Sequence, residues 1–416
     1  MLSQFSFSNY KSFKKEAFLD FTAESIKDHE KSVIKDKVDG ERFLPVIAIY
    51  GPNGGGKSTV LEALRYLSIL LMRPFIMSQI QNNTEFESII KRFSEGETRE
   101  KYHMFDPKCK DIPISFDIMF RTKGKQYKYQ LSYMHNQIIE ENLYRLILGE
   151  KDTDIIFERS VNECILGDEL EDIPVEKIRS SMPLLVHVAI NYDIEPVDDV
   201  MSWFMDIEFL DYDDPQKERK IILPKTKRER MKMFEMLQKM DISICDIREE
   251  KDLDGKIVGI YVKHILEKGL FYEIPYEEES SGTRKLFSCL AKIMDCLKNG
   301  TLLIADELDA KLHPKLLQYI IELFTDTKSN RRGAQLLLTS HDITTMSPEV
   351  YRRDEIWFCA LNPQNASKLY SLVSFRKENG QIPRNDEAYG KQYLEGRYGA
   401  DPYIRKILNW GGENES

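Results

Sequence analysis

The sequence predicts an α/β fold built on a central, mostly parallel sheet. Three apolar segments of strand length, Val46–Tyr50, Leu302–Asp306 and Leu336–Thr339, each run directly into polar residues. Parallel strands that helices cover on both faces have this continuous apolar character, and ligands bind at their carboxyl ends. We expect an antiparallel β lobe beside the sheet and a helical insertion between about residues 183 and 240.

The antiparallel lobe is predicted from two regions of alternating sequence. Residues 2–7 are expected to form an opening strand, and residues 17–21 a strand that pairs back on it. A meander is expected from Ile112 to about Leu148, and a hairpin over residues 252–274. We predict one domain over 1–416, composed of an N-terminal lobe (1–182), the insertion and hairpin (183–275), a second lobe (276–375) and a tail (376–416).

The first parallel strand leads into a glycine-rich loop, Gly51–Ser58, with the sequence Gly-Pro-Asn-Gly-Gly-Gly-Lys-Ser, and then into a leucine-rich helix. Glycines let backbone N–H groups surround a triphosphate, and the helix N-terminus adds positive potential. In such a loop Lys57 reaches the β- and γ-phosphates, and the Ser58 hydroxyl binds Mg²⁺. We therefore expect a bound nucleoside triphosphate. The residues expected to contact it here are Asn53, Gly54, Gly55, Gly56, Lys57, Ser58 and Thr59.

Polar residues also follow the other two strands. Asp306 fits the role of a Mg²⁺ partner, directly or through a water, and Glu307 fits the base that polarises the attacking water. His341 comes just after the third strand and is expected to contact the γ-phosphate and to sense its loss. A core histidine that donates to a carbonyl is the alternative for His341. The predicted catalytic residues are thus Lys57, Glu307 and His341.

A second anion site is predicted where Ser280, Ser281, Gly282 and Thr283 precede a helix. An ordinary helix N-cap is the alternative. One nucleotide does not need two phosphate-binding helix starts in the same chain. Two chains packed head to tail would use one of each at every nucleotide, so the sequence predicts a dimer that forms on ATP.

These segments resemble, in content and in order, the motifs of ATP-binding-cassette ATPases of the structural-maintenance and double-strand-break-repair type. Ser281 stands where that signature motif has glycine. The resemblance implies a P-loop NTPase of the ABC-ATPase type that hydrolyses ATP with Mg²⁺, and it adds Asp309 to the nucleotide-contacting residues. The matching segments are Gly51–Ser58 (Walker A), Ser280–Thr283 (signature), Ile304–Glu307 (Walker B), Asp309 with Leu312–Pro314 (D-loop), His341 (switch histidine) and Phe7–Phe13 (N-terminal strand and turn). The Q-loop glutamine stays open among Gln79, Gln81 and Gln130.

Within that superfamily the chain resembles the compact bacterial ATPases with AAA-like domains of the 15 and 21 types. These include the ATPase half of the overcoming-lysogenisation nucleases and stand-alone relatives in phage-defence operons. The segment Tyr393–Ala400 is similar to the tail of the stand-alone RloA-like group, whose members are typically encoded beside a separate effector. The resemblance implies a sensor or regulator ATPase that controls an effector of nuclease or toxin type. A DNA-repair or chromosome-maintenance ATPase that binds DNA directly is the alternative.

Composition narrows the choice of partners and compartment. The net charge of −10 excludes a global basic field for nucleic acid, while the basic stretch Lys217–Lys232 is either a solvated helix face or a local nucleic-acid site. The longest apolar run is too short to cross a bilayer, and the N-terminus does not resemble a secretory signal. Six scattered cysteines without a Cys-x-x-Cys pair are typical of reduced thiols in a cytoplasmic protein.

Overall fold

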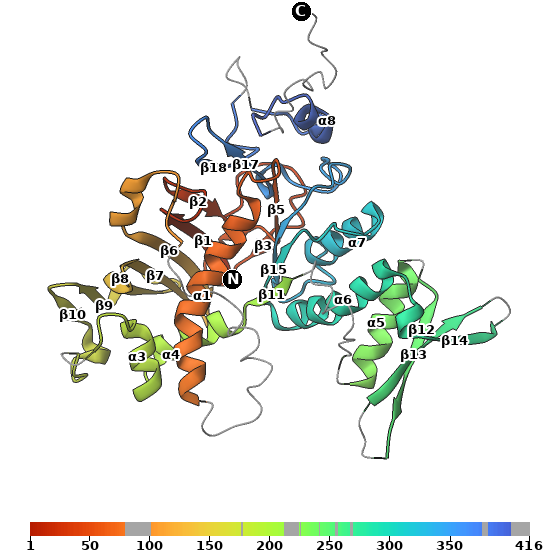
Figure 1. The fold of residues 1–416 in the computed structure, drawn as a ribbon, viewed down its shortest axis with the longest axis horizontal. Helices are drawn as coiled ribbons and strands as arrows, with labels where there is room; N and C mark the ends of the chain where they lie inside the picture. Colours follow the sequence, from red (N-terminus) through yellow and green to blue (C-terminus); the bar gives the residue numbers. More distant parts are fainter. Residues whose placement is uncertain are drawn as a thin grey trace, which may run out of the picture.

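A six-stranded central sheet organises the molecule (Figure 1). The computed structural model describes residues 1–79, 101–175, 178–211, 224, 226–240, 242–253, 257–266, 269–376 and 382–400. The strand order is β11-β15-β16-β5-β17-β18, and every pair is parallel except β17 with β18. The three predicted strands lie side by side as β15, β16 and β5. The bounds are β5 Val46–Tyr50, β11 Glu208–Asp211, β15 Leu302–Asp306, β16 Gln335–Thr339, β17 Ile356–Leu361 and β18 Ser367–Ser371.

Different helices cover the two faces of this sheet. Side chains alternate along a strand, so neighbouring residues of β5 enter different cores. Ile47 and Ile49 pack in one core with the apolar side of α1 (Lys57–Gln79), whereas Val46 and Ala48 pack in another with α6 (Ser281–Asn299) and α7 (Pro314–Thr325). The start of α1 and the start of α6 therefore belong to opposite faces.

A seven-stranded antiparallel sheet lies beside α1, in the order β10-β9-β8-β7-β6-β1-β2. The predicted opening strand, its return strand and the meander are confirmed as β1, β2 and β6–β8. Two further strands extend the meander. The bounds are β1 Leu2–Ser8, β2 Ala17–Asp20, β6 Ile114–Thr122, β7 Lys125–Met134, β8 Gln137–Ile147, β9 Thr153–Ser160 and β10 Cys164–Leu166.

The region predicted as a helical insertion is only partly helical and is not all an insertion. Helices α3 (Leu184–Asn191) and α4 (Glu195–Met205) pack in the core that contains α1, where Trp203 stacks on Phe120 with ring centroids 4.0 Å apart. The next segment is β11, which extends the central sheet. The prediction was wrong here because local periodicity identifies a helix but not the surface that the helix covers.

The rest of that region forms an arm, defined here as α5 (Lys227–Lys239) with the three-stranded sheet β12-β13-β14. The predicted hairpin over 252–274 is incomplete, since the first strand already begins at Ile244. Both turns of this sheet include residues outside the described ranges. The strand bounds are β12 Ile244–Lys251, β13 Ile257–Ile265 and β14 Phe271–Pro275.

The C-terminal segment packs onto the central sheet. Tyr393 of α8 (Tyr389–Leu394) and Tyr398 both stack on Phe358 of β17, with centroid distances of 5.7 and 5.2 Å. The Gly399 N–H donates to the Gly396 carbonyl at 3.1 Å, and both glycines have left-handed backbones, so this part of the tail is a turn. The remaining elements are β3 Ile34–Lys35, β4 Arg42–Phe43 and the 3₁₀ turns Pro107–Asp111, Asp168–Leu170, Tyr276–Glu278 and Arg353–Glu355.

A buried arginine fastens residues 24–28 to the edge of this core. Arg352 is fully buried and donates to the Asp354 carboxylate at 2.9 and 2.8 Å, and to the backbone carbonyls of Glu24 and Asp28. Substituting Arg352→Met leaves Asp354 with an uncompensated buried charge. We expect it to lower the free energy of unfolding by about 3–5 kcal/mol, measured by urea denaturation.

Arg384→Met is the matched control, because Arg384 pairs with Asp386 at 2.9 Å on the open surface. Its effect should stay below about 1 kcal/mol. Equal effects of the two substitutions would contradict the role assigned to Arg352.

Candidate nucleotide-binding site

The glycine-rich loop is held tightly at both ends. Gly51 has φ +153°, and a Cβ there would lie 2.3 Å from the Cys359 carbonyl oxygen of β17. Gly56 has φ +104°, and a Cβ there would lie 2.6 Å from Ser367 Oγ and 2.9 Å from the Phe13 ring. At both positions φ is positive and neighbouring atoms lie too close for a Cβ, so only glycine fits. The loop is therefore a fixed cradle, with Asn53 and Gly54 exposed at its tip.

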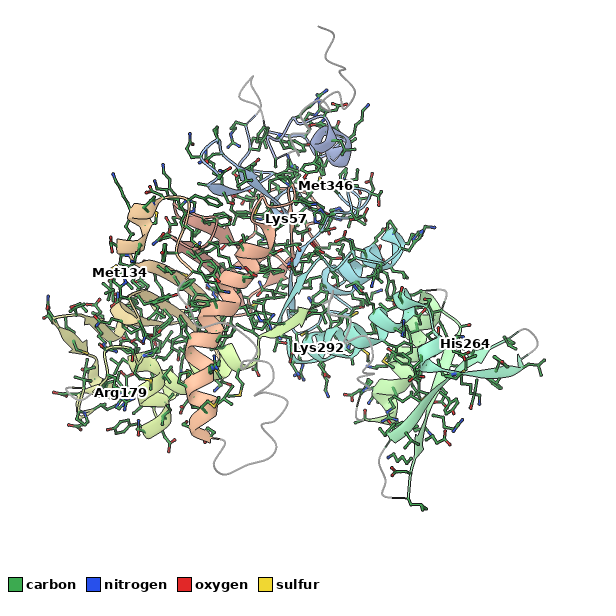
Figure 2. The ribbon with its side chains drawn as sticks, viewed as in Figure 1. Lys57, Met134, Arg179, His264, Lys292 and Met346 are labelled. Carbon is green, nitrogen blue, oxygen red and sulfur yellow. The ribbon has the colours of Figure 1, made fainter. Side chains whose placement is uncertain are left out.

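Lys57 begins α1 and folds back over the loop, at the site labelled in Figure 2. Its Nζ donates to the carbonyl oxygens of Gly51 at 3.0 Å and of Pro52 at 3.2 Å. Burial lowers the pKa of Lys57 from its ordinary value. Phosphate oxygens would give this ammonium stronger, charge-assisted hydrogen bonds than neutral carbonyls do.

Thr339, at the end of β16, joins the carboxyl end of β15 to the loop helix. Its hydroxyl donates to Asp306 Oδ1 at 2.5 Å and accepts from the Glu307 N–H at 2.7 Å. The same Asp306 oxygen accepts from Ser58 Oγ at 3.1 Å. Thr339 is not among the site residues predicted from the sequence, although it is the polar residue that ends the third apolar strand.

The pair formed by Ser58 and Asp306 suits magnesium. A hydroxyl and one carboxylate oxygen converge at 3.1 Å beside the phosphate cradle. Mg²⁺ takes oxygen ligands and is commonly held by one or two carboxylates together with substrate phosphates and waters. The residues present therefore fit the ion.

Glu307 and His341 face each other at the solvent-exposed side of this cluster. His341 Nε2 lies 3.7 Å from Glu307 Oε1, and the two side chains are 40% and 42% exposed. His341 is thus not a core histidine. Its backbone N–H donates to Asp309 Oδ2 at 3.0 Å, which ties it to the loop after β15.

Ser280–Thr283 lies apart from this cluster, at the start of α6. Ser280 Oγ accepts from the Thr283 N–H at 3.1 Å and shares a hydrogen bond with Thr283 Oγ1 at 2.8 Å, as an N-cap does. A Cβ on Gly282 would lie 3.1 Å from the Lys311 carbonyl oxygen, so the turn packs on the loop that contains Asp309. The structure brings together the predicted residues of the loop, Asp306, Glu307 and His341. It places Ser280, Ser281, Gly282 and Thr283 on the other face of the sheet.

A hollow of about 960 Å³ opens beside the glycine-rich loop. Asn53 and His341 border it on the nucleotide side, and Tyr393, Leu394 and Ala400 border it on the tail side. The tail segment that resembles the RloA-like group is therefore a direct neighbour of the site.

The structure does not single out a Q-loop glutamine, and it does not support a nucleic-acid site in the basic stretch Lys217–Lys232. Gln130 is on the antiparallel sheet, bonded to Asp117 Oδ2 at 2.6 Å, and Gln79 ends α1. Gln81, Lys217, Arg219, Lys220 and Lys225 lie outside the described residues.

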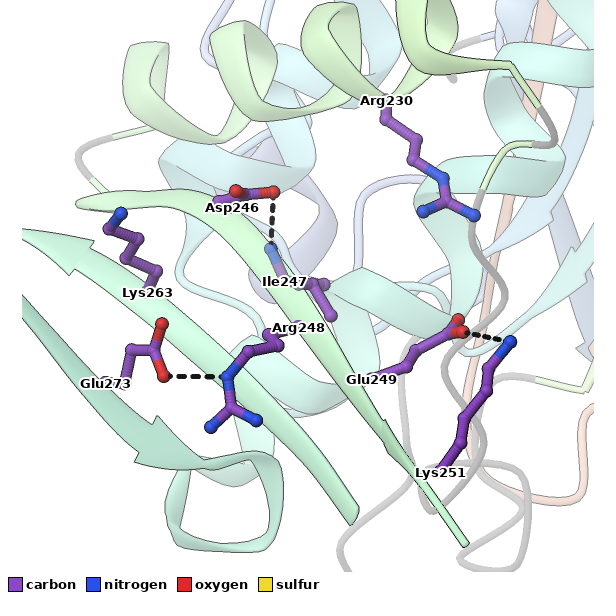
Figure 3. A pocket seen from close by; sticks show the side chains of 8 residues that line it. All are labelled: Arg230, Asp246, Ile247, Arg248, Glu249, Lys251, Lys263 and Glu273. Carbon is purple, nitrogen blue, oxygen red and sulfur yellow. Dashed lines mark hydrogen bonds and ion pairs between the residues drawn. The ribbon is translucent and has the colours of Figure 1, made fainter. Parts of the chain in front are cut away.

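The described part of the arm has a hollow of about 450 Å³ in which cations and carboxylates alternate (Figure 3). Arg248 pairs with Glu273 at 3.1 Å, and Lys251 with Glu249 at 3.6 Å. These pairs favour a solvated, charge-balanced surface over a site for a phosphate backbone.

Comparison with known proteins identifies the family. Residues 46–163 and 176–347 match the family described as "AAA domain, putative AbiEii toxin, Type IV TA system". The match covers most of the chain and includes the glycine-rich loop, Asp306, Glu307 and His341. The chain belongs to this family and is a nucleotide-binding P-loop ATPase of the ABC/SMC-like type, as the motifs predicted.

Among solved structures, the chain is similar to the ATP-binding cassette MJ0796 in a dimeric, post-hydrolysis state bound to ADP and Pi. The identity is 12% and the TM-score 0.29, over 89% of this chain and 100% of that one. No curated protein matches the chain. Of the described helices, none combines the length and apolar character needed to cross a membrane.

The hydrogen bonds of Thr339 generate a test. Thr339→Val keeps the shape of the side chain but removes the donor to Asp306 and the acceptor for the Glu307 N–H. Hydrogen bonds to charged groups contribute about 1.5–3 kcal/mol, so kcat for ATP hydrolysis should fall roughly 10- to 100-fold. ATP affinity, measured by isothermal titration, should change little because Lys57 is untouched.

Thr325→Val provides the control, since Thr325 is at the far end of α7 and bonds weakly to the Glu322 carbonyl at 3.5 Å. It should hydrolyse ATP at the wild-type rate. Normal turnover by Thr339→Val would show that the position of Asp306 and Glu307 does not depend on this hydroxyl.

Proposed function

We propose that the protein is a Mg²⁺-dependent ATP hydrolase that dimerises on ATP and uses hydrolysis as a conformational signal. One observation carries the proposal: two helix starts suited to anions lie on opposite faces of one sheet. The start of α1 carries the glycine-rich loop, and the start of α6 carries Ser280–Thr283. The sheet separates the two starts within a chain, whereas two copies packed head to tail would bring one of each to every nucleotide.

In this proposal each group of the cluster has a defined task. The loop N–H groups and Lys57 bind the phosphates, and Ser58 and Asp306 hold Mg²⁺, which offsets phosphate charge when bound. Glu307 accepts a hydrogen bond from the attacking water and orients it. Thr339 keeps Glu307 in place through the Glu307 N–H, at 2.7 Å.

His341 connects the γ-phosphate end of the site to the second anion site. Its N–H is bound to Asp309, and the Asp309 loop supplies the Lys311 carbonyl that Gly282 packs against. Loss of a phosphate at His341 would therefore be transmitted to Ser280–Thr283 of the same chain, and so to the second copy. The free energy of nucleotide binding in one copy would thereby alter the contact between the two copies.

We infer that this signal controls a separately encoded effector in bacterial defence against phage. The family description names a putative toxin of a type IV toxin–antitoxin system, which supports a role in a system of two paired components. The tail segment at Tyr393 and Ala400 borders the nucleotide-site hollow, so a partner bound there would sense the nucleotide state. All six cysteines are free, which agrees with a cytoplasmic location.

Dimerisation on ATP is tested with a variant that binds but does not hydrolyse. Glu307→Gln removes the carboxylate that orients water and should trap a dimer on Mg·ATP, measured as a doubling of mass by light scattering. Adding Lys57→Ala to that variant should abolish the doubling, because the main cationic contact to the phosphates is lost. A strictly monomeric Glu307→Gln protein at saturating ATP would contradict the dimer mechanism.

Control of an effector is tested by a pull-down. The Glu307→Gln protein with ATP should retain the product of an adjacent gene, in the presence of nuclease to remove DNA. A parallel pull-down without nuclease that retains DNA but not this gene product, together with stimulation of the wild-type ATPase by DNA, would instead favour the DNA-repair or chromosome-maintenance function.

A further inference from the structure

The arm is joined to the second anion site along the chain, where β14 leads through Tyr276–Glu278 to Ser280, and also by a side-chain contact from its central strand. His264, on the central strand of the arm sheet, has its Nε2 2.5 Å from Glu279 Oε1. Glu279 is the residue immediately before Ser280, whose hydroxyl caps α6. Figure 2 labels His264 within the arm, well away from Lys57. The contact therefore joins an element remote from the phosphate loop to the turn that is proposed to close on a second copy.

The chemistry of the two groups determines which of them donates the hydrogen bond. A carboxylate at neutral pH only accepts hydrogen bonds, so His264 Nε2 must be the donor. The other ring nitrogen, Nδ1, lies 2.9 Å from Ser243 Oγ, at the start of β12. A serine hydroxyl can donate or accept, so both ring nitrogens are satisfied and the ring orientation is fixed. The side chains of His264 and Glu279 are only 19% and 8% exposed, which shields the pair from water.

The backbone on either side of Glu279 is also fixed. Tyr276 is buried, packs edge-on against Phe287 of α6 at 6.2 Å, and donates its hydroxyl to the Arg284 carbonyl at 3.2 Å. The Glu279 N–H donates to the Tyr276 carbonyl at 3.1 Å. Tyr276 thus holds the segment to α6 itself, and His264 holds it to the arm. A shift of the arm sheet against α6 would act on Glu279 and so on Ser280.

We propose that His264 is a positioning residue, and that through Glu279 the arm sets the geometry of Ser280–Thr283 and thereby the strength of the ATP-dependent contact between two copies. This proposal rests on the head-to-tail dimer proposed above. It makes the arm a control element for the nucleotide site, although the described residues of the arm contribute no group to the phosphate loop. A partner that displaces the β12-β13-β14 sheet would change the affinity of one copy for another.

The test uses the full chain carrying Glu307→Gln, which is proposed to accumulate the ATP dimer. Adding His264→Ala should raise the dimer dissociation constant at saturating Mg·ATP roughly 10-fold or more, by light scattering, because a hydrogen bond to a buried charge is lost. The affinity of the monomer for ATP, measured at protein concentrations below dimerisation, should change less than about twofold. A residue with a purely structural role would not separate these two readouts.

Two further variants complete the design. His264→Gln retains an N–H donor near the position of Nε2 and should restore most of the dimer affinity. Arg248→Ala breaks the Arg248–Glu273 pair of the same sheet, on the face that strand alternation places opposite His264, and should leave dimerisation unchanged. Circular dichroism on heating establishes that all variants are folded.

The outcomes separate the two proposals. If the Glu307→Gln parent stays monomeric with ATP, the proposed function and this inference both fail. If the parent dimerises and His264→Ala dimerises equally well, or His264→Gln is as defective as His264→Ala, only the inference about the arm is overturned.

Discussion

The nucleotide site depends on one hydroxyl group that ties together the ends of two parallel strands. Thr339 donates to Asp306 and accepts from the backbone of Glu307, so one side chain positions both the carboxylate proposed to bind Mg²⁺ and the carboxylate proposed to orient water. A hydroxyl is suited to this because it is at once a donor and an acceptor. Threonine is also stiff at χ1, which limits the orientations that the hydroxyl can take. In the proposed mechanism, the register of β16 against β15 thus positions the groups that act in hydrolysis.

The sequence was sufficient to predict the parallel strands and the residues at their ends. Apolar segments that stop at polar residues mark buried strands, and β5, β15 and β16 have the predicted positions. Thr339 could not be assigned in the same way. Its partner is set by the pairing of Ala305 with Leu338, which brings the two strand ends level. Register of this kind is a property of the folded sheet, not of either segment alone.

The errors in the predicted insertion have a related cause. The helices near residues 184–205 were expected from local periodicity, but their packing depends on partners remote in the chain, such as Phe120 against Trp203. Strand β11 spans only Glu208–Asp211 and offers too short a pattern to separate from a loop. The contact between His264 and Glu279 was invisible for the same reason, since a lone histidine and a lone glutamate carry no spacing signal.

The separation of the two predicted anion sites is the basis of the proposed signalling by hydrolysis. In the proposed mechanism the α1 face holds the phosphates, and the α6 face presents Ser280–Thr283 to a second copy. The path between them passes through His341, Asp309 and Lys311, each in contact with the next element by a hydrogen bond or by close packing. Close-packed groups have little room to yield, so a small displacement of one group moves the next.

The backbone at Glu307 indicates that this arrangement is held under constraint. Glu307 has φ +47°, a left-handed conformation that few residues other than glycine adopt. Such a conformation costs on the order of 1 kcal/mol and persists only where surrounding contacts enforce it. Here the Glu307 N–H is bound by Thr339, and the Glu307 carbonyl accepts from the Ala310 N–H at 2.9 Å. Glycine would relieve the strain but would remove the carboxylate. A glutamate at a strained position, with its carboxylate 3.7 Å from His341 Nε2, is consistent with the chemical task proposed for that carboxylate.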